Sequence, residues 1–489
     1  MTSNDTGASA ALPADDVIWR GSFTDDEVRE FADLSGDHNP IHVDAVAARR
    51  LLFGRPVVHG MAGVLTALDA YAAQGGHAPG RLQVAFRRPM LMGTAIEVVR
   101  SAGDPDGTRL VIRSGGEDLT ILTLTGTAPG GHEDTPEQSQ PVAASSRPGR
   151  ARTSTTPAER TFGDGGDQSG VLSVLSDQAR FAARYPAAWS SLGPLRAQAL
   201  ATLSRLVGMV LPGRHSLFTG LDVSLAAQAV DHVLAWSLER ARAPIAPITI
   251  EVSGAGLHGT VEALFRPAPV RQPSMAQVAT DANVPSLSGQ RVLVVGGSRG
   301  LGELLAKIAA SAGADVTITY VRGRADAERV AAEIRDAGFL CAVAQVEADE
   351  LAEYVARSAP FAHVYYLATP PITRDMSPAS DATDDYRRIY VTAFAQLVTA
   401  LGERGARTTV LYPSTTYVTQ APPGLSGYVA AKSAGEALCI DLQDRYPGLR
   451  ILVQRLPPMA TDQTNALVQR APQPTLPLAR DIVVAMIGA

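Results

Sequence analysis

Two stretches without any hydrophobic period interrupt this chain of 489 residues. They run from about Pro129 to Glu159 and from about Arg266 to Ser288, and between them they combine Pro, Gly, Ser, Thr and charged residues. Segments of this kind are typical of linkers. Since the chain is also too long for one hydrophobic core, we expect three folded blocks, at residues 1–128, 160–265 and 289–489, joined by linkers at 129–159 and 266–288.

The composition excludes several classes of function. Hydrophobic residues make up 45% of the chain, which is enough to form the cores of these blocks. The formal net charge is −6, so no broad positive field attracts nucleic acid or an anionic membrane. The two cysteines, Cys341 and Cys439, lie in apolar stretches, which favours a reducing compartment over disulfides or a metal site. The polar start lacks the pattern of a secretion signal, and no apolar run of about 18 residues follows. We therefore expect a cytoplasmic protein without a metal, membrane or nucleic-acid partner.

The last block alternates strand-like and helix-like stretches. A β-branched run at Arg291–Val295 leads into a glycine-rich turn and then into a helical stripe that includes Leu304 and Ile308. A second strand is expected at Val316–Val321, and the alternation continues as far as Ile451–Gln454. This order predicts an α/β fold with a doubly wound parallel sheet of the Rossmann type.

The first two blocks share weak internal similarity. Each begins with a Phe-Ala pair, Phe31-Ala32 and Phe181-Ala182, and each has a later strand-like segment, Leu82–Phe86 and Leu221–Leu225. We interpret the two blocks as an internal duplication in which only the first copy keeps catalytic residues.

A two-part motif occupies the first block. It comprises Leu34-Ser-Gly-Asp-His-Asn-Pro-Ile-His-Val-Asp44 and, further along, Phe53-Gly-Arg-Pro-Val-Val-His-Gly-Met61. The pattern Ser-Gly-Asp-x-Asn-Pro-x-His with a downstream Pro-x-x-His-Gly resembles the MaoC-like (R)-specific enoyl thioester hydratases and dehydratases. The resemblance implies an α+β double hotdog fold for the first two blocks, with the middle block shaping the acyl or pantetheine tunnel.

The same resemblance assigns the catalytic roles. Asp37 and His42 are the acid/base pair, and the backbone N–H of Gly60, at the start of an expected central helix, stabilises the enolate oxygen. Pro40 rigidifies the turn between the pair. The alternative is that Asp37 only caps a helix and His42 is a solvated loop residue. One departure concerns Leu68, because hydratases of this family often have a serine there.

Four arginines are candidates for contact with a phosphate of coenzyme A or phosphopantetheine. The alternative is that they are solvated side chains at strand ends. They are Arg81, Arg87, Arg88 and Arg214.

The last block carries a second catalytic pattern. Tyr428-Val-Ala-Ala-Lys432 follows the glycine turn by about 130 residues, and Ser414 lies fourteen residues before Tyr428. Together these residues resemble the short-chain dehydrogenase/reductase superfamily, which implies that Tyr428 exchanges a proton with the substrate oxygen. Lys432 lowers the pKa of that phenol and holds the nicotinamide ribose, and Ser414 orients the carbonyl. Thr415, at the commoner spacing of thirteen, is the alternative to Ser414.

NADPH is the expected cofactor. Arg299 lies within the glycine turn, and Arg322 and Arg324 lie just after the second strand, where they can pair with a 2′-phosphate. No acidic residue stands at that strand end to favour NADH. Besides Tyr428 and Lys432, the expected cofactor-binding residues are Gly296, Ser298, Arg299, Gly300, Leu301, Gly302 and Arg322.

This block also departs from the family pattern. Val295 replaces the usual Thr, Tyr365–Pro370 replaces Asn-Asn-Ala-Gly, and no Asn lies between Asn283 and Asn465, so the tetrad Asn is missing. We expect a working but divergent reductase; the alternative is a non-catalytic cofactor-binding module.

The fusion itself is informative, because a ketoreductase and a dehydratase catalyse consecutive steps. We expect reduction of a 3-ketoacyl thioester and dehydration of the product in fatty-acid or polyketide assembly. The substrate would be carried on acyl carrier protein or coenzyme A, and the enzyme would be a homodimer. The alternatives are one active domain with the other as a docking module, or a non-catalytic NADPH-binding scaffold.

Overall fold

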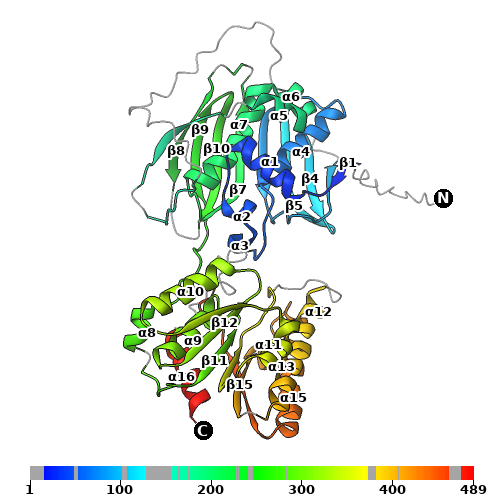
Figure 1. The fold of residues 1–489 in the computed structure, drawn as a ribbon. Helices are drawn as coiled ribbons and strands as arrows, with labels where there is room; N and C mark the ends of the chain where they lie inside the picture. Colours follow the sequence, from blue (N-terminus) through cyan, green and yellow to red (C-terminus); the bar gives the residue numbers. More distant parts are fainter. Residues whose placement is uncertain are drawn as a thin grey trace, which may run out of the picture. The chain divides into compact units, whose positions relative to one another are not determined.

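The computed structural model describes most of the chain, in two compact units, Met1–Ala268 and Pro269–Ala489 (Figure 1). The predicted linker at 129–159 lies outside the described residues except for its last four positions. Among the described helices, none is both long and apolar enough to cross a membrane. The described ranges are 16–48, 53–101, 107–127, 156–163, 166–174, 177–226, 228–229, 231–240, 246–281, 283–372, 381–405, 407–461 and 475–488.

The first unit is built on one ten-stranded antiparallel sheet. Its strand order is β1-β3-β4-β5-β2-β7-β10-β9-β8-β6, so the five strands of each half follow the same order and meet where β2 pairs with β7. This repeat supports the predicted duplication. The strands are β1 (Asp16–Gly21), β2 (Pro79–Phe86), β3 (Ile96–Ser101), β4 (Gly107–Ser114), β5 (Glu117–Thr127), β6 (Ser169–Ser173), β7 (Ser216–Leu225), β8 (Val233–Arg240), β9 (Ile248–Gly254) and β10 (Leu257–Phe265).

Each half of this unit contributes a central helix, α4 and α7, which contact each other in one hydrophobic core. Both helices are buried on most sides, which is why their sequences show no polar face. The helices are α1 (Asp25–Ser35), α2 (Pro40–Val43), α3 (Ala45–Ala48), α4 (Gly60–Ala73), α5 (Gln178–Arg184), α6 (Pro186–Leu192) and α7 (Pro194–Arg205), which continues into the π-helical turn η1 (Leu206–Val210).

The second unit has a six-stranded parallel sheet in the order β13-β12-β11-β14-β15-β16. Numbered within the unit, this is the order 3-2-1-4-5-6 of a Rossmann fold, as the sequence predicted. Separate hydrophobic clusters cover the two faces of the sheet. The strands are β11 (Arg291–Val295), β12 (Asp315–Tyr320), β13 (Cys341–Gln345), β14 (His363–Tyr366), β15 (Thr408–Thr415) and β16 (Leu449–Leu456).

Helices lie on both sides of this parallel sheet (Figure 1). Helix α9 packs with α16 on one side, and α11 packs with α13 on the other. The helices are α9 (Gly300–Ser311), α10 (Arg324–Asp336), η2 (Ala348–Glu350), α11 (Leu351–Arg357), α12 (Asp381–Arg387), the π-helical turn η3 (Arg388–Ala393), α13 (Phe394–Glu403), α14 (Tyr417–Gln420), α15 (Ser426–Arg445) and α16 (Thr475–Ile487).

The segment 266–288, expected to be a linker, contains packed structure. Helix α8 (Met275–Asp281) contacts α9, and its Met275 and Val278 are buried. The buried ammonium of Lys307 donates a hydrogen bond to the carbonyl of Pro273. These two apolar residues, one helical turn apart, pack α8 against α9. The Pro and polar residues around them hide the hydrophobic periodicity in the sequence, so the helix was not predicted.

Candidate active sites

The loop that carries Asp37 and His42 is defined at both ends by local caps. Helix α1 ends at Gly36, whose positive φ of 74° closes the helix, so Asp37 follows directly. The side chain of Asn39 accepts a hydrogen bond from the backbone N–H of Ile41 and caps α2. The predicted Asn-Pro turn is therefore the start of a short helix, on which His42 lies.

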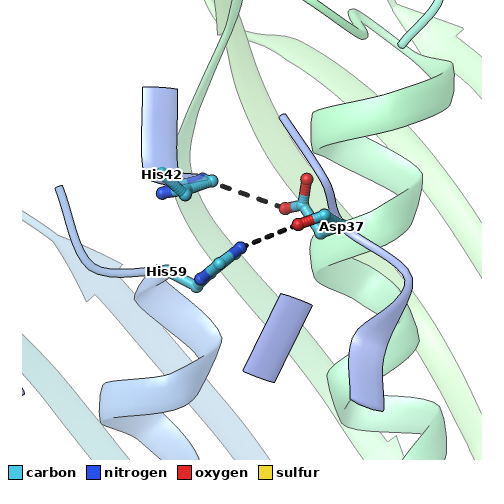
Figure 2. Close-up of side chains that lie close together, drawn as sticks. All are labelled: Asp37, His42 and His59. Atoms are coloured by element: carbon cyan, nitrogen blue, oxygen red, sulfur yellow. Dashed lines mark hydrogen bonds and ion pairs between the residues drawn. The ribbon is translucent and has the colours of Figure 1, made fainter. Parts of the chain in front are cut away.

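The structure brings Asp37 and His42 together (Figure 2). The carboxylate oxygen Oδ2 of Asp37 lies 3.9 Å from Nε2 of His42, and Asp37 is only 2% exposed. Nδ1 of His42 lies 2.8 Å from the carbonyl oxygen of Val57. Because a carbonyl only accepts hydrogen bonds, Nδ1 carries the proton of the neutral ring. The lone pair of Nε2 is thus left facing the carboxyl group.

Burial shifts both groups toward their uncharged forms. It raises the pKa of Asp37, against the opposing effects of His42 and of the hydrogen bond from Ser204. Burial likewise lowers the pKa of His42, against the attraction of Asp37. The alternative, a helix cap beside a solvated histidine, does not fit a buried pair. A neutral imidazole beside a carboxyl with a raised pKa can act as a base and an acid.

His59 completes the cluster, although no role was predicted for it from the sequence. Its Nε2 lies 2.9 Å from the backbone carbonyl of Asp37, and its ring stacks on that of His42 at 3.8 Å (Figure 2). Donor atoms of the three residues lie within 4.8 Å of one another. However, the two rings are only 25° from parallel, so their lone pairs point along separate planes. This geometry suits a role of His59 in holding the ring of His42 in place better than it suits binding of one metal ion by the three residues.

Gly60 is the first residue of α4, as predicted. Its N–H belongs to the first helical turn, where backbone donors have no partner within the helix. A Cβ atom at Gly60 would lie 2.7 Å from the ring of Phe86, so any side chain there would force that ring to shift. The oxyanion role of this N–H stays a prediction.

Two of the arginines considered for phosphate binding are paired within the protein. Arg81 makes two hydrogen bonds of 2.7 Å to Asp222 across the junction of β2 and β7. Arg88 lies 3.2 Å from Glu117. These contacts favour structural roles for both.

In the second unit, the glycine turn follows β11 and opens α9. Gly296 and Gly300 have positive φ angles of 78° and 57°. A Cβ atom at Gly302 would lie 2.3 Å from the carbonyl oxygen of Gly296, so strand and helix approach more closely than any side chain permits. This cradle at a helix N-terminus fits a dinucleotide pyrophosphate.

The other predicted cofactor residues divide between the turn and its surroundings. Ser298 and Arg299 lie in the turn, and Arg322 is exposed just after β12. Leu301 is 6% exposed and packs in the core, so only its backbone can face a cofactor.

Tyr428 and Lys432 lie one turn apart on α15 and both are buried. The hydroxyl of Tyr428 hydrogen-bonds the side chain of Thr415, while burial raises the pKa of the phenol to about 12. Ser414 instead donates to Glu436, which also accepts two hydrogen bonds from Arg455. The structure thus places Thr415, and not Ser414, beside the tyrosine.

Lys432 lies in an aromatic surrounding that the sequence did not predict. Its Nζ donates a 2.6 Å hydrogen bond to the carbonyl of Pro413 and lies 3.7 Å from the ring centroid of Tyr390. Burial lowers its pKa to about 7. Tyr390 stands on η3, and its hydroxyl lies 2.5 Å from that of Thr369. The missing Asn was the only sequence signal for this change.

Fold and sites together define a chain with a double hotdog unit of the hydratase/dehydratase type and a Rossmann unit of the NAD(P)-dependent oxidoreductase type. Residues 15–109 match the family model described as "MaoC like domain", and residues 292–466 match that of the "NAD dependent epimerase/dehydratase family". An (R)-specific enoyl-CoA hydratase from Aeromonas caviae is 33% identical over 99 residues, which cover 20% of this chain and 69% of that protein. The chain therefore belongs to the MaoC-like hydratase/dehydratase family.

Two other relatives are matched over less of their length. The 3-hydroxyacyl-thioester dehydratase X of Mycobacterium tuberculosis is 34% identical over 116 residues, or 23% of this chain and 39% of that protein. The 3-hydroxybutyryl-CoA dehydratase of Methylorubrum extorquens is 32% identical over 87 residues, or 17% of this chain and 54% of that protein. Among solved structures, a putative short-chain dehydrogenase from Escherichia coli CFT073 complexed with NADPH is 22% identical, with a TM-score of 0.38 over 42% of this chain and 92% of that one.

Proposed function

We propose that this chain is a bifunctional enzyme that processes the β-carbon of acyl thioesters. Its second unit reduces a 3-ketoacyl thioester with NADPH, and its first unit dehydrates the 3-hydroxyacyl product to a trans-2-enoyl thioester. The observation that carries the proposal is the presence, in one chain, of the buried Asp37–His42 pair and of Tyr428 and Lys432 in a unit with a dinucleotide-type glycine turn.

In the dehydration step, the unprotonated Nε2 of His42 removes the α-proton of the substrate. The carboxyl group of Asp37, whose pKa is raised by burial, donates its proton to the departing hydroxyl group, which leaves as water. The N–H of Gly60 at the start of α4 stabilises the charge on the thioester oxygen.

In the reduction step, NADPH supplies the hydride when it is bound. The turn Gly296–Gly302 would hold its pyrophosphate, and Arg299 and Arg322 would pair with its 2′-phosphate. Tyr428 donates the proton that the reduced oxygen needs, and Thr415, which shares a hydrogen bond with it, orients the carbonyl. Lys432 supports the phenol and the ribose.

The substrate is a thioester of coenzyme A or of acyl carrier protein, in fatty-acid or polyketide assembly, and the protein acts as a homodimer. The names of two relatives specify coenzyme A thioesters, which makes coenzyme A the practical choice for a first assay.

The test supplies the full-length protein with NADPH and acetoacetyl-CoA. We expect loss of nicotinamide absorbance together with 3-hydroxybutyryl-CoA and crotonyl-CoA, identified by mass spectrometry. A second candidate is a dehydratase whose Rossmann unit binds NADPH without turnover; the contacts of Lys432 with Pro413 and Tyr390 favour it. NADPH binding without oxidation, alongside hydration of crotonyl-CoA, would establish that candidate.

A further inference from the structure

The half of the first unit that lacks the acid/base motif reaches into the site. Ser204, near the end of α7, donates its hydroxyl to Oδ2 of Asp37 over 2.7 Å, although 167 positions separate the two residues. Both residues are almost completely buried, with 4% and 2% exposed. In Figure 2 the carboxyl group of Asp37 lies beside the translucent green helix of that second half.

The π-helical turn after α7 fits closely around the same loop. A Cβ atom at Gly208 would lie 2.2 Å from Oδ1 of Asp37, so the absence of a side chain there makes room for the carboxyl group. The carbonyl of Gly208 accepts a 2.8 Å hydrogen bond from the side-chain amide of Asn39. Ser204 and the turn therefore hold two residues of the catalytic loop at once.

We propose that Ser204 is a positioning residue of the dehydratase site, whose hydroxyl holds the carboxyl group of Asp37 toward Nε2 of His42. The inference rests on the proposed function of the Asp37–His42 pair and extends it. It gives the second half a part in orienting the proton-transfer group, in addition to the expected shaping of the acyl tunnel.

Two hydrogen bonds fix the orientation of the carboxyl group. Oδ1 accepts from the backbone N–H of Asn39 over 3.2 Å, and Oδ2 accepts from Ser204. Without the hydroxyl, Oδ2 loses its hydrogen-bond donor from α7, and rotation about the last side-chain bond becomes easier. Since a misplaced catalytic group loses rate steeply with distance, the turnover number should fall more than the substrate affinity.

The hydroxyl also has an electrostatic effect that a purely structural serine would not have. Its hydrogen bond favours the ionised carboxylate and lowers the pKa of Asp37, as do the charges of His42 and His38. Burial acts in the opposite direction. His59 hydrogen-bonds the backbone carbonyl of Asp37, and the charge of Arg266 lowers the pKa of His42. Loss of the hydroxyl should therefore raise the pKa of Asp37.

The test uses the full-length chain and measures the pH dependence of crotonyl-CoA hydration. For Ser204→Ala and the near-isosteric Ser204→Cys, a weak donor, we expect kcat to fall about tenfold with little change in KM. The limb of the pH profile that depends on Asp37 should move to higher pH. Ser204→Thr, which keeps the hydroxyl, should retain most of both properties.

Thr202 provides the matched control. It is equally buried on the same helix, but its hydroxyl donates to the carbonyl of Gln198 within that helix. Thr202→Val should therefore leave the pH profile in place, even if it lowers the melting temperature as much as the Ser204 variants do. If Ser204→Ala and Ser204→Cys keep the wild-type profile and kcat, the proposal is wrong.

A measurement without substrate separates this inference from the proposed function. In protein labelled with 13C at aspartate carboxyl carbons, Asp37→Asn assigns the Asp37 signal, and its titration gives the pKa directly. We expect a higher pKa in Ser204→Ala than in wild type and Thr202→Val. If wild type hydrates no enoyl-CoA, the proposed function fails, but this titration still decides whether Ser204 controls Asp37. An unchanged pKa would overturn the inference.

Discussion

Asp37 shows how closely a single side chain depends on its surroundings. It directly follows the left-handed cap of α1, one of its oxygens accepts from the backbone of Asn39, and the other accepts from Ser204 in the second half. At 2% exposure it has no room to relax. Small changes of volume next to this carboxyl group should therefore affect activity before they affect the fold.

Gly208→Ala tests this tight fit. The new methyl group would meet Oδ1 of Asp37 at 2.2 Å, so the carboxyl group must leave its present position beside His42. We expect crotonyl-CoA hydration to fall about a hundredfold, because displacement by an ångström is enough to cost that much rate. Steady-state kinetics give the loss, and unchanged NADPH binding checks that the second unit is intact. Near-normal hydration would contradict the described packing.

Ser414 and Thr415 form a second residue-scale test. Because Thr415 hydrogen-bonds Tyr428 and Ser414 binds Glu436, Thr415→Val should reduce ketone reduction about a hundredfold. Ser414→Ala should mainly lower stability, by about 1–3 kcal/mol, because it leaves a charged acceptor short of one donor. NADPH oxidation rates and denaturant unfolding distinguish the two effects. If Ser414→Ala slows NADPH oxidation more than Thr415→Val does, Ser414 has the catalytic role.

At the scale of elements, the turn between β11 and α9 depends on a close approach of backbone to backbone. The Cα of Gly302 faces the carbonyl of Gly296 with no space for a methyl group. The strand end and the helix start must therefore separate if any side chain is added, and the backbone donors that would meet the pyrophosphate separate with them.

Gly302→Ala should weaken NADPH binding more than tenfold, since it adds that methyl group. Gly448→Ala is the control, because a Cβ atom there meets nothing within 4 Å. Fluorescence titration with NADPH measures both affinities. Equal affinities in the two variants would show that this turn does not hold the cofactor.

Helix α15 buries the ammonium of Lys432 among tyrosines, which lowers its pKa to about 7. Between pH 7 and about 10, the unfolded chain therefore binds a proton that the folded chain lacks, so this group makes folding less favourable toward the lower end of the range. The free energy of unfolding of wild type minus that of Lys432→Met should rise with pH across this window. Denaturant unfolding at several pH values, without cofactor, measures it; parallel curves would contradict a depressed pKa.

At the scale of the whole molecule, the proposed function puts two sites for consecutive steps in one polypeptide. Covalent linkage raises the effective concentration of an intermediate released by one site at the other. The proposal of two separate sites therefore makes a prediction about variants that each lose one of them.

Asp37→Asn should oxidise NADPH and accumulate 3-hydroxybutyryl-CoA from acetoacetyl-CoA, because only dehydration is lost. Tyr428→Phe should fail to oxidise NADPH but still dehydrate added 3-hydroxybutyryl-CoA. An equimolar mixture of the two should again form crotonyl-CoA, more slowly than wild type at low protein concentration. Mass spectrometry of the thioesters follows each step. Loss of both activities in either variant would argue against independent sites.

Local patterns in the sequence were sufficient for the Rossmann fold, for Gly60 at a helix start, and for Tyr428 and Lys432 one turn apart on a helix. The double hotdog fold was expected from the resemblance that the two-part motif carries, and His42, expected across a turn from Asp37, lies on the short helix α2. Strand and helix periods reflect which faces are buried, and glycine or Asn-Pro turns depend on backbone angles that neighbouring residues set. Such properties are contained in a few consecutive residues, so they can be recognised without the fold.

Only the tertiary structure decided which distant side chains meet. The contact of Ser204 with Asp37, the choice of Thr415 over Ser414, the ring of Tyr390 against Lys432 and the docking of α8 all join parts of the chain that carry no shared local pattern. Hydrogen bonds and close packing act over a few ångströms in space rather than along the sequence. Their partners are therefore determined by how the strands and helices pack.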